Sequence, residues 1–181
     1  MNLPGSEGEH QAQEEFGTTR RAMAFYNKQM LNYLNPLMRE FIAHQEMVFI
    51  ATADAHGDCD CSFRAGLPGF VQILDDTTLA YPEYRGNGVM ASIGNITENA
   101  HIGMLFIDFF ESTVGLHVNG TARVVSNDDL RASPKVTPEM IKATQTTGGH
   151  HPERWIFVEV QEAYIHCSKH IPLLQKLPKD I

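Results

Sequence analysis

The chain has 181 residues, which is the usual size of one domain and long enough to bury a hydrophobic core. Its 43% hydrophobic and 20% charged residues are typical of a soluble globular protein, and no apolar run approaches the roughly 20 residues that a membrane span needs. A formal net charge of −8, with only 14 Lys and Arg residues scattered along the chain, argues against broad nucleic-acid binding.

The termini and the cysteines indicate a single intracellular domain. Residues 1–13 are polar and acidic and lack the basic-then-apolar pattern of a secretory signal, so we expect a cytoplasmic protein. The three cysteines, Cys59, Cys61 and Cys167, suggest free thiols in a reducing compartment. We expect residues 1–11 to form a disordered or extended tail and residues 12–181 to form one domain.

Two helices are predicted before the first strand. Residues 13–33 have a helical composition with one apolar face, which predicts the first helix. Asn35 followed by Pro36 is typical of an N-cap with proline at the first helical position, and this predicts a second helix that runs to about Gln45.

A β pattern then begins. Residues 47–52 form a β-prone run, residues 54–58 contain the glycine of a hairpin turn, and a return strand is expected through Arg64. Further strands are predicted at residues 70–74 and 77–81, joined by turns.

The second half of the chain continues this pattern. It predicts a short helix at 89–96, an apolar strand at 101–109, an alternating strand at 115–125, a helix at 137–144, a Gly148-Gly149 loop and a long strand at 154–167. The alternating strand places Leu116, Val118, Ala122 and Val124 on one face and His117, Asn119, Thr121 and Arg123 on the other. The second of these faces should line something polar.

About six short strands joined by tight turns, with few helices between them, favour a closed antiparallel barrel over a parallel α/β sheet. We therefore predict a mainly β, α+β fold in which the helices flank or plug an antiparallel β-barrel.

The segment from Tyr81 to Gly88 is a candidate phosphate site. It leaves a strand and enters a helix, and Gly86 and Gly88 allow the backbone to approach a ligand closely. Arg85 offers a fork of donors that suits an anion. The alternative is a solvated turn in which Arg85 pairs with a nearby carboxylate.

The segment from Cys61 to Gly66 is a second candidate. Strand alternation sends Ser62 and Arg64 to the face opposite Cys61 and Phe63. Arg64 could then reach an anionic or electron-accepting ligand, or it could be an edge-strand arginine that is paired on the surface.

No metal site is predicted. Cys59-x-Cys61 and His166-Cys167 offer soft ligands, but zinc sites usually show wider, paired spacing. The nine histidines are dispersed, and His150-His151 is expected to be solvated in a loop. The chain also lacks an HExxH helix, a Walker phosphate loop, a GxGxxG turn and a GxSxG elbow.

Three stretches, residues 59–71, 79–96 and 115–120, are similar to the pyridoxamine 5′-phosphate oxidase-like family, and a weaker similarity extends over nearly the whole chain. The resemblance implies a split antiparallel β-barrel of the FMN-binding type. It also implies a homodimer that holds FMN in a cleft where the two subunits meet.

The resemblance implies roles for particular residues. Ser62, Phe63 and Arg64 would lie along the isoalloxazine ring, with Tyr81, Pro82 and Glu83 continuing the wall. Arg85, Asn87 and Gly88 would hold the phosphate, with Asn95 nearby, while His117 and Asn119 would contact the flavin or the partner subunit.

The implied function is that of an FMN-dependent oxidoreductase, which transfers electrons or hydride to or from an unidentified small molecule. Arg64 is the predicted catalytic residue, as the positive group near the pyrimidine end of the flavin. Two alternatives stay open: a non-enzymatic flavin-binding or flavin-carrying module, and the same fold with haem or a deazaflavin.

The C-terminal segment departs from the family pattern. The oxidase of vitamin B6 metabolism ends in a segment with a tryptophan and an arginine that grips its phosphorylated substrate, whereas here no matching arginine follows Trp155. We therefore do not expect pyridoxamine phosphate itself to be oxidised. His166, Cys167 and Lys169 either shape a different substrate cleft or pack as an ordinary strand end.

Overall fold

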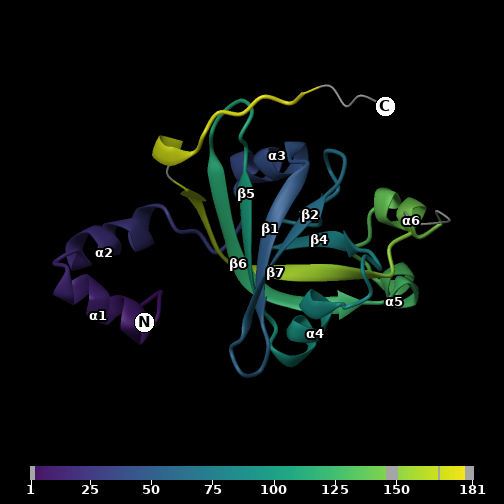
Figure 1. Cartoon of the computed structure of the whole chain (residues 1–181), viewed down its shortest axis with the longest axis horizontal. Coiled ribbons are helices and arrows are strands. Elements are labelled where there is room, and N and C mark those ends of the chain that lie inside the picture. Colours follow the sequence, from purple (N-terminus) through teal and green to yellow (C-terminus); the bar gives the residue numbers. More distant parts are fainter. Residues whose placement is uncertain (1–2, 146–150, 167, 178–181) are drawn as a thin grey trace.

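One antiparallel sheet organises the chain. The computed structural model describes residues 3–145, 151–166 and 168–177, and in this part the sheet has seven strands that curl into a split barrel (Figure 1). The strands are β1 (Met47–Ala53), β2 (Cys59–Ala65), β3 (Gln72–Ile73), β4 (Thr78–Glu83), β5 (His101–Ile107), β6 (Gly115–Val125) and β7 (Arg154–His166). Their order across the sheet is β2-β1-β5-β6-β7-β4-β3, which confirms the predicted mainly β, antiparallel split barrel.

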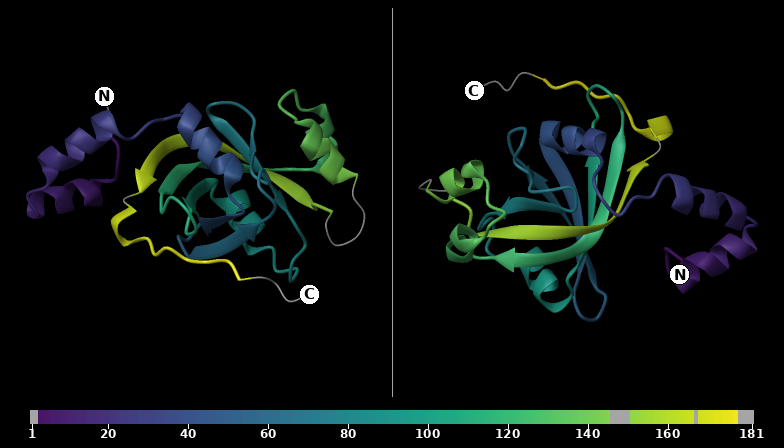
Figure 2. Two further views of the ribbon diagram at one scale, coloured as in Figure 1. Left: turned by 90° about the horizontal axis from the view of Figure 1, so that it is seen from above. Right: turned by 180° about the vertical axis from the view of Figure 1, so that it is seen from behind.

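Helices lie at two opposite sides and at both ends of the barrel (Figures 1 and 2). They are α1 (Glu7–Glu15), α2 (Thr19–Lys28), α3 (Pro36–His44), α4 (Ala91–Glu98), α5 (Asn127–Ala132), α6 (Pro138–Thr144) and the short 3₁₀ turn η1 (Ser168–His170). The α1–α2 pair projects from one side and α5 and α6 lie on the opposite side (Figures 1 and 2). Helices α3 and α4 cover the two ends of the barrel.

The N-terminal expectations are wrong in two respects. Residues 7–11, expected in a tail, are helical because the Ser6 side chain caps α1 by accepting a hydrogen bond from the backbone N–H of Glu9. The single helix expected over residues 13–33 is two helices, because Gly17 takes a left-handed conformation with φ 64° and ends the first. The chain beyond α2 is extended, since Leu31 pairs with Ala163 of β7.

Other local predictions are confirmed. The side chain of Asn35 caps α3 by accepting a hydrogen bond from the backbone N–H of Met38, and β1 and β2 form the expected hairpin with Phe49 opposite Phe63.

Helix α4 begins at Ala91, two residues later than expected. Helix α5 was not predicted, because its six residues are too few to show a hydrophobic period. The expected Gly148-Gly149 loop lies outside the described residues.

The core fills the inside of the curled sheet. The inner faces of β1, β5, β6 and β7 bury Ile50, Met104, Val118 and Val158, each almost without solvent exposure. A separate cluster around Trp155 lies under α5 and α6. Within the described residues, no helix is both long enough and apolar enough to cross a membrane.

The longest strand pair, β6 with β7, bends at a bulge between Asn119 and Gly120. A Cβ atom at Gly120 would collide with the backbone carbonyl of Glu159 on β7. The bend therefore depends on the absence of a side chain at this position.

We expect Gly120→Ala to lower the free energy of unfolding by about 3 kcal/mol, because one of two packed backbones must move. Gly94→Ala is the matched control. Nothing lies within 4 Å of its Cβ position in α4, so this change should instead stabilise the protein by about 0.5 to 1 kcal/mol. Urea unfolding of both variants measures the difference, and equal effects would contradict the assigned clash.

Candidate functional site

A cleft of about 410 Å³ opens where the two ends of the sheet approach each other. Its walls come from β2, from the end of β4 with the loop that follows, and from the start of α4. It is lined by Asp60, Ser62, Arg64, Glu83, Tyr84, Arg85, Gly86, Asn87, Val89, Met90, Ala91, Ser92 and Ile93. This volume lies within the usual range of small-molecule sites.

An ion pair between Arg64 and Glu83 forms the base of the cleft. Arg64 donates from Nε and Nη2 to the same Glu83 oxygen, at 3.0 and 2.8 Å. The two side chains are only 19% and 9% exposed. No described backbone pairing joins β2 to β3 or β4, so this charged contact links the two open ends of the sheet.

Hydroxyl groups extend this contact into a network. Arg64 Nη2 also donates to Ser92 Oγ at 3.2 Å, and Ser92 Oγ lies 3.4 Å from Ser62 Oγ. Ser62 donates to Asp60 at 2.8 Å. Because Asp60, Ser62 and Arg64 alternate along β2, the strand directs all three into the cleft, as predicted for Ser62 and Arg64.

The mouth of the cleft carries the predicted phosphate-binding segment. Arg85 forms a 2.8 Å ion pair with Glu153, and its side chain remains 77% exposed. This carboxylate contact was the alternative interpretation of Arg85, yet the arginine also lines the cleft. Gly86 has φ 51°, and a Cβ atom there would face open space, so the loop leaves room for a ligand.

The N-terminus of α4 also faces this cleft. Its N-cap residue is Met90, which has a left-handed backbone and no side-chain oxygen to cap the helix. The first helical N–H groups therefore have no side-chain cap, and they lie beside Arg85 and Gly86 in the cleft wall.

Burial shifts the pKa of Glu83 at the base of the cleft and of Tyr81 in the barrel core. It raises the pKa of Glu83, although the hydrogen bond and the charge of Arg64 act in the opposite direction. Burial also raises the pKa of the Tyr81 hydroxyl, which has no hydrogen-bond partner among the described residues.

Several predicted site residues lie outside this cleft. Tyr81 is fully buried in the barrel core, and Pro82 is buried opposite Trp155 of β7. Phe63 is 52% exposed on the outer face of the sheet, where its ring packs on Phe49. Asn95 donates to Thr52 at 3.1 Å from the middle of α4. Gly88 has φ 81° and follows the lining residue Asn87 in the same loop.

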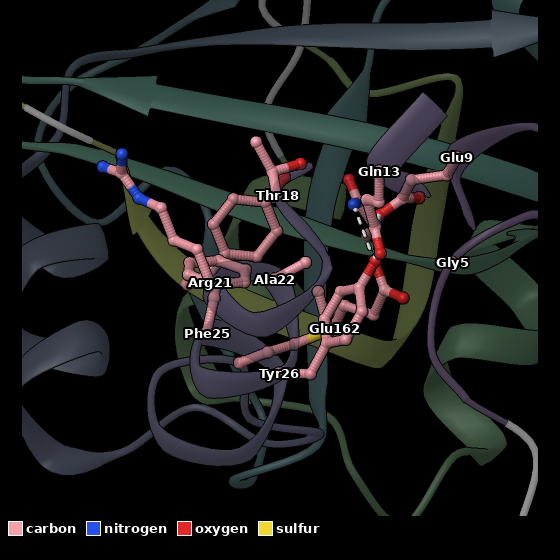
Figure 3. Close-up of a pocket in the computed structure, with 12 residues that line it drawn as sticks. Gly5, Glu9, Gln13, Thr18, Arg21, Ala22, Phe25, Tyr26 and Glu162 are labelled. Carbon is pink, nitrogen blue, oxygen red and sulfur yellow. Dashed lines mark hydrogen bonds between the residues drawn. The ribbon is translucent and has the colours of Figure 1, made fainter. Parts of the chain in front are cut away.

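His117 and Asn119 lie on the outer face of β6, away from the cleft. The His117 ring stacks on Tyr164 with ring centroids 4.7 Å apart, and Asn119 donates to Glu162 at 3.2 Å. Asn119 lines a second cavity, between the α1–α2 pair and the sheet (Figure 3). The structure of this chain therefore does not bring all the predicted site residues together.

Sequence reasoning missed the polar cleft residues Asp60, Tyr84 and Ser92, and it missed Glu153, which pairs with Arg85 at the mouth. Asp60 shares the alternation of Ser62 and Arg64 and could have been found by extending that pattern by one step. Ser92 and Glu153 had no such signal, since their positions depend on how α4 and the segment before β7 pack.

The described residues contain no group of three or more His, Cys, Asp and Glu side chains placed to hold a metal ion. Cys59 and Cys61 are free and exposed on the outer face of β2. Cys167 lies outside the described residues.

Comparison with known proteins agrees with this fold. The family model for pyridoxamine 5′-phosphate oxidase matches residues 34–167, and the chain belongs to this family. Residues 34–167 include all the strands and the whole cleft. A search of curated proteins found no match.

Solved structures share the fold at low sequence identity. HupZ of Group A Streptococcus is 23% identical with a TM-score of 0.54, and the match covers 73% of this chain and 93% of HupZ. A candidate pyridoxamine 5′-phosphate oxidase from Lactobacillus delbrueckii is 19% identical with a TM-score of 0.52, and the match covers 75% of this chain and 98% of that protein.

We expect Arg64→Met to lower the free energy of unfolding at neutral pH by about 3 kcal/mol, because it leaves the Glu83 carboxylate buried without its cation. The loss should shrink at about pH 5, since protonation of a carboxyl group with a raised pKa favours the folded state and this stabilisation disappears as the pH rises. Urea unfolding at the two pH values tests both statements.

The double variant Arg64→Met/Glu83→Gln is the control, because it removes both charges. It should recover most of the stability and lose the added pH dependence. A double variant as unstable as the single one would show that the ion pair does not close the barrel.

Proposed function

We propose that this protein is an FMN-dependent oxidoreductase that acts as a homodimer. The observation that carries the proposal is the cleft at the split of the barrel, where Arg64, Arg85 and the N-terminus of α4 converge. Membership of the pyridoxamine 5′-phosphate oxidase family supports it.

The mouth of the cleft suits the phosphate of FMN. An anion here would meet the first N–H groups of α4, the open backbone at Gly86 and the exposed guanidinium of Arg85. Arg85 would exchange its contact with Glu153 for the ligand, which costs little because a solvent-exposed ion pair is weak.

The base of the cleft suits the polar edge of the flavin ring. The isoalloxazine of bound FMN would supply the electron or hydride transfer. Arg64 would hold positive charge close to the ring, and Glu83 and Ser92 keep its guanidinium in place. The hydroxyls of Ser62 and Ser92 can donate or accept hydrogen bonds at the same edge.

The outer face of the sheet suits a second copy of the chain. Phe63, Phe49, Leu105, His117 and Tyr164 are direct neighbours across five strands, and each is at least partly exposed. In the next row, Cys61, Ala51 and Gly103 have small side chains or none. Neighbouring exposed apolar side chains on a sheet face are typical of a protein interface. A symmetric partner would bring its own His117 and Asn119 to such an interface.

The visible spectrum of the purified protein, followed by release and identification of its bound small molecule, tests the cofactor. Oxidised FMN gives two bands in the visible and near-ultraviolet, whereas haem gives a Soret band. A haem spectrum, or no uptake of added FMN, would overturn the proposal. Rapid turnover of the FMN-loaded protein with a nicotinamide donor would distinguish an oxidoreductase from a flavin carrier.

We expect Arg85→Ala to weaken FMN binding by about tenfold or more, because a charge-assisted contact to the phosphate is lost. Arg131→Ala is the matched control, since Arg131 is also an exposed arginine in an ion pair but lies on α5, away from the cleft. Quenching of flavin fluorescence on titration gives both dissociation constants. Equal affinities of the two variants for FMN would show that the phosphate does not bind at this loop.

We expect Phe63→Glu to dissociate the homodimer, because it introduces a charge into the apolar row across the sheet. Leu37→Glu changes a side chain that is 74% exposed on α3 and should leave the dimer intact. Sedimentation velocity measures the oligomeric state. A dimer that survives Phe63→Glu would place the interface elsewhere.

A further inference from the structure

The second cavity, of about 480 Å³, lies between the α1–α2 pair and the outer face of β6 and β7 (Figure 3). It shares no lining residue with the cleft between β2 and α4. Any ligand of this cavity therefore has its own site within the subunit.

Aromatic and apolar side chains form its walls. Phe25 packs edge-on against Tyr164, with ring centroids 5.2 Å apart, and also meets Tyr26 at 6.3 Å. Met30 and Ala22 add further apolar surface. These rings come from α2 and β7, so the cavity exists only because the helical pair folds back on the sheet.

Two carboxylates face this aromatic surface from opposite elements. Glu9 of α1 accepts a hydrogen bond from the hydroxyl of Tyr26, and Glu162 of β7 accepts one from Asn119 at 3.2 Å. The ion pairs found among the described residues include neither carboxylate. In the part of the chain that the structure describes, the side-chain donors to these two carboxylates, Gln13, Tyr26 and Asn119, are neutral.

Both carboxylates act on the same two phenols. Burial raises the pKa of Tyr26 and of Tyr164, and Glu9 and Glu162 raise each of them further. Two like charges that converge on one cavity repel each other, and a bound cation would relieve this repulsion. Arg21 lies at the rim, but its guanidinium points away from Glu9 and Tyr26 (Figure 3).

From this arrangement we propose that the cavity binds a small organic cation. A primary ammonium group would lie between Glu9 and Glu162, and the apolar body of the ligand would pack on Phe25 and Tyr164. Carboxylates supply charge-assisted hydrogen bonds to an ammonium group, and ring faces attract a cation through their quadrupole. A metal ion would leave the aromatic surface without a partner.

The experiment compares two probes of nearly the same shape. Protonated 2-phenylethylamine and neutral 2-phenylethanol are titrated into the purified full-length protein by calorimetry. We expect saturable binding of the amine and at least tenfold weaker binding of the alcohol. Equal binding of the two, or no saturable binding of the amine, would overturn the proposal.

Matched variants locate the site. Glu162→Gln should weaken binding of the amine by about tenfold, because one charge-assisted contact is lost. Glu159→Gln removes the same charge from an exposed position on the same strand, outside the cavity, and should have no effect. Equal losses of amine affinity in both variants would show that the effect comes from general surface charge and not from this cavity.

A third variant and a measurement of assembly complete the test. Phe25→Leu keeps the apolar wall but removes the ring, and should weaken binding without unfolding the protein, as circular dichroism would check. If Glu162→Gln altered the oligomeric state and left the affinity for the amine unchanged, the cation that pairs with Glu162 would belong to another copy of the chain. The proposal would then be wrong.

Discussion

The ion pair between Arg64 and Glu83 is the constraint on which the rest of the structure depends. A split barrel has two open sheet edges that no backbone ladder joins. Here the guanidinium of Arg64 on β2 and the carboxylate of Glu83 on β4, both largely buried, connect the two sides. Burying two charges is costly unless hydrogen bonds satisfy them, and Ser92 supplies one of these bonds. The same contact holds α4 beside β2, so the closure of the barrel and the shape of the cleft have one cause.

The two faces of the sheet have different roles. The inner face is filled by aliphatic side chains and stabilises the fold, whereas the outer face of β2, β1 and β5 is apolar without a covering helix. At the other end of this outer face, the α1–α2 pair projects beside β7 (Figure 1), contacts it through Phe25 and Tyr164, and borders the second cavity. Two cavities therefore lie along one curled sheet, one at its split and one beside its N-terminal helices.

Local sequence patterns predicted the structure correctly where interactions between neighbouring residues determine it. The cap at Asn35, the β1–β2 hairpin and the alternation that directs Ser62 and Arg64 to one face all follow from a few neighbouring residues. The early end of α2 at Lys28 was missed because Leu31 pairs with Ala163, which lies more than a hundred residues along the chain. A helical composition cannot report a competing strand partner at that distance.

The sequence alone determined the antiparallel β class and the polar faces of β2 and β6, because residue type at a fixed local period encodes them. The family resemblance came instead from three stretches of similar sequence, residues 59–71, 79–96 and 115–120. Only the tertiary structure decided which charges meet. Glu83 is 19 residues from Arg64 and lies on β4, five strands away from β2 in the sheet order. Glu9 lines the same cavity as Glu162 only because the two N-terminal helices lie beside β7. Such contacts arise from chain topology and packing, which a local pattern of residues does not contain.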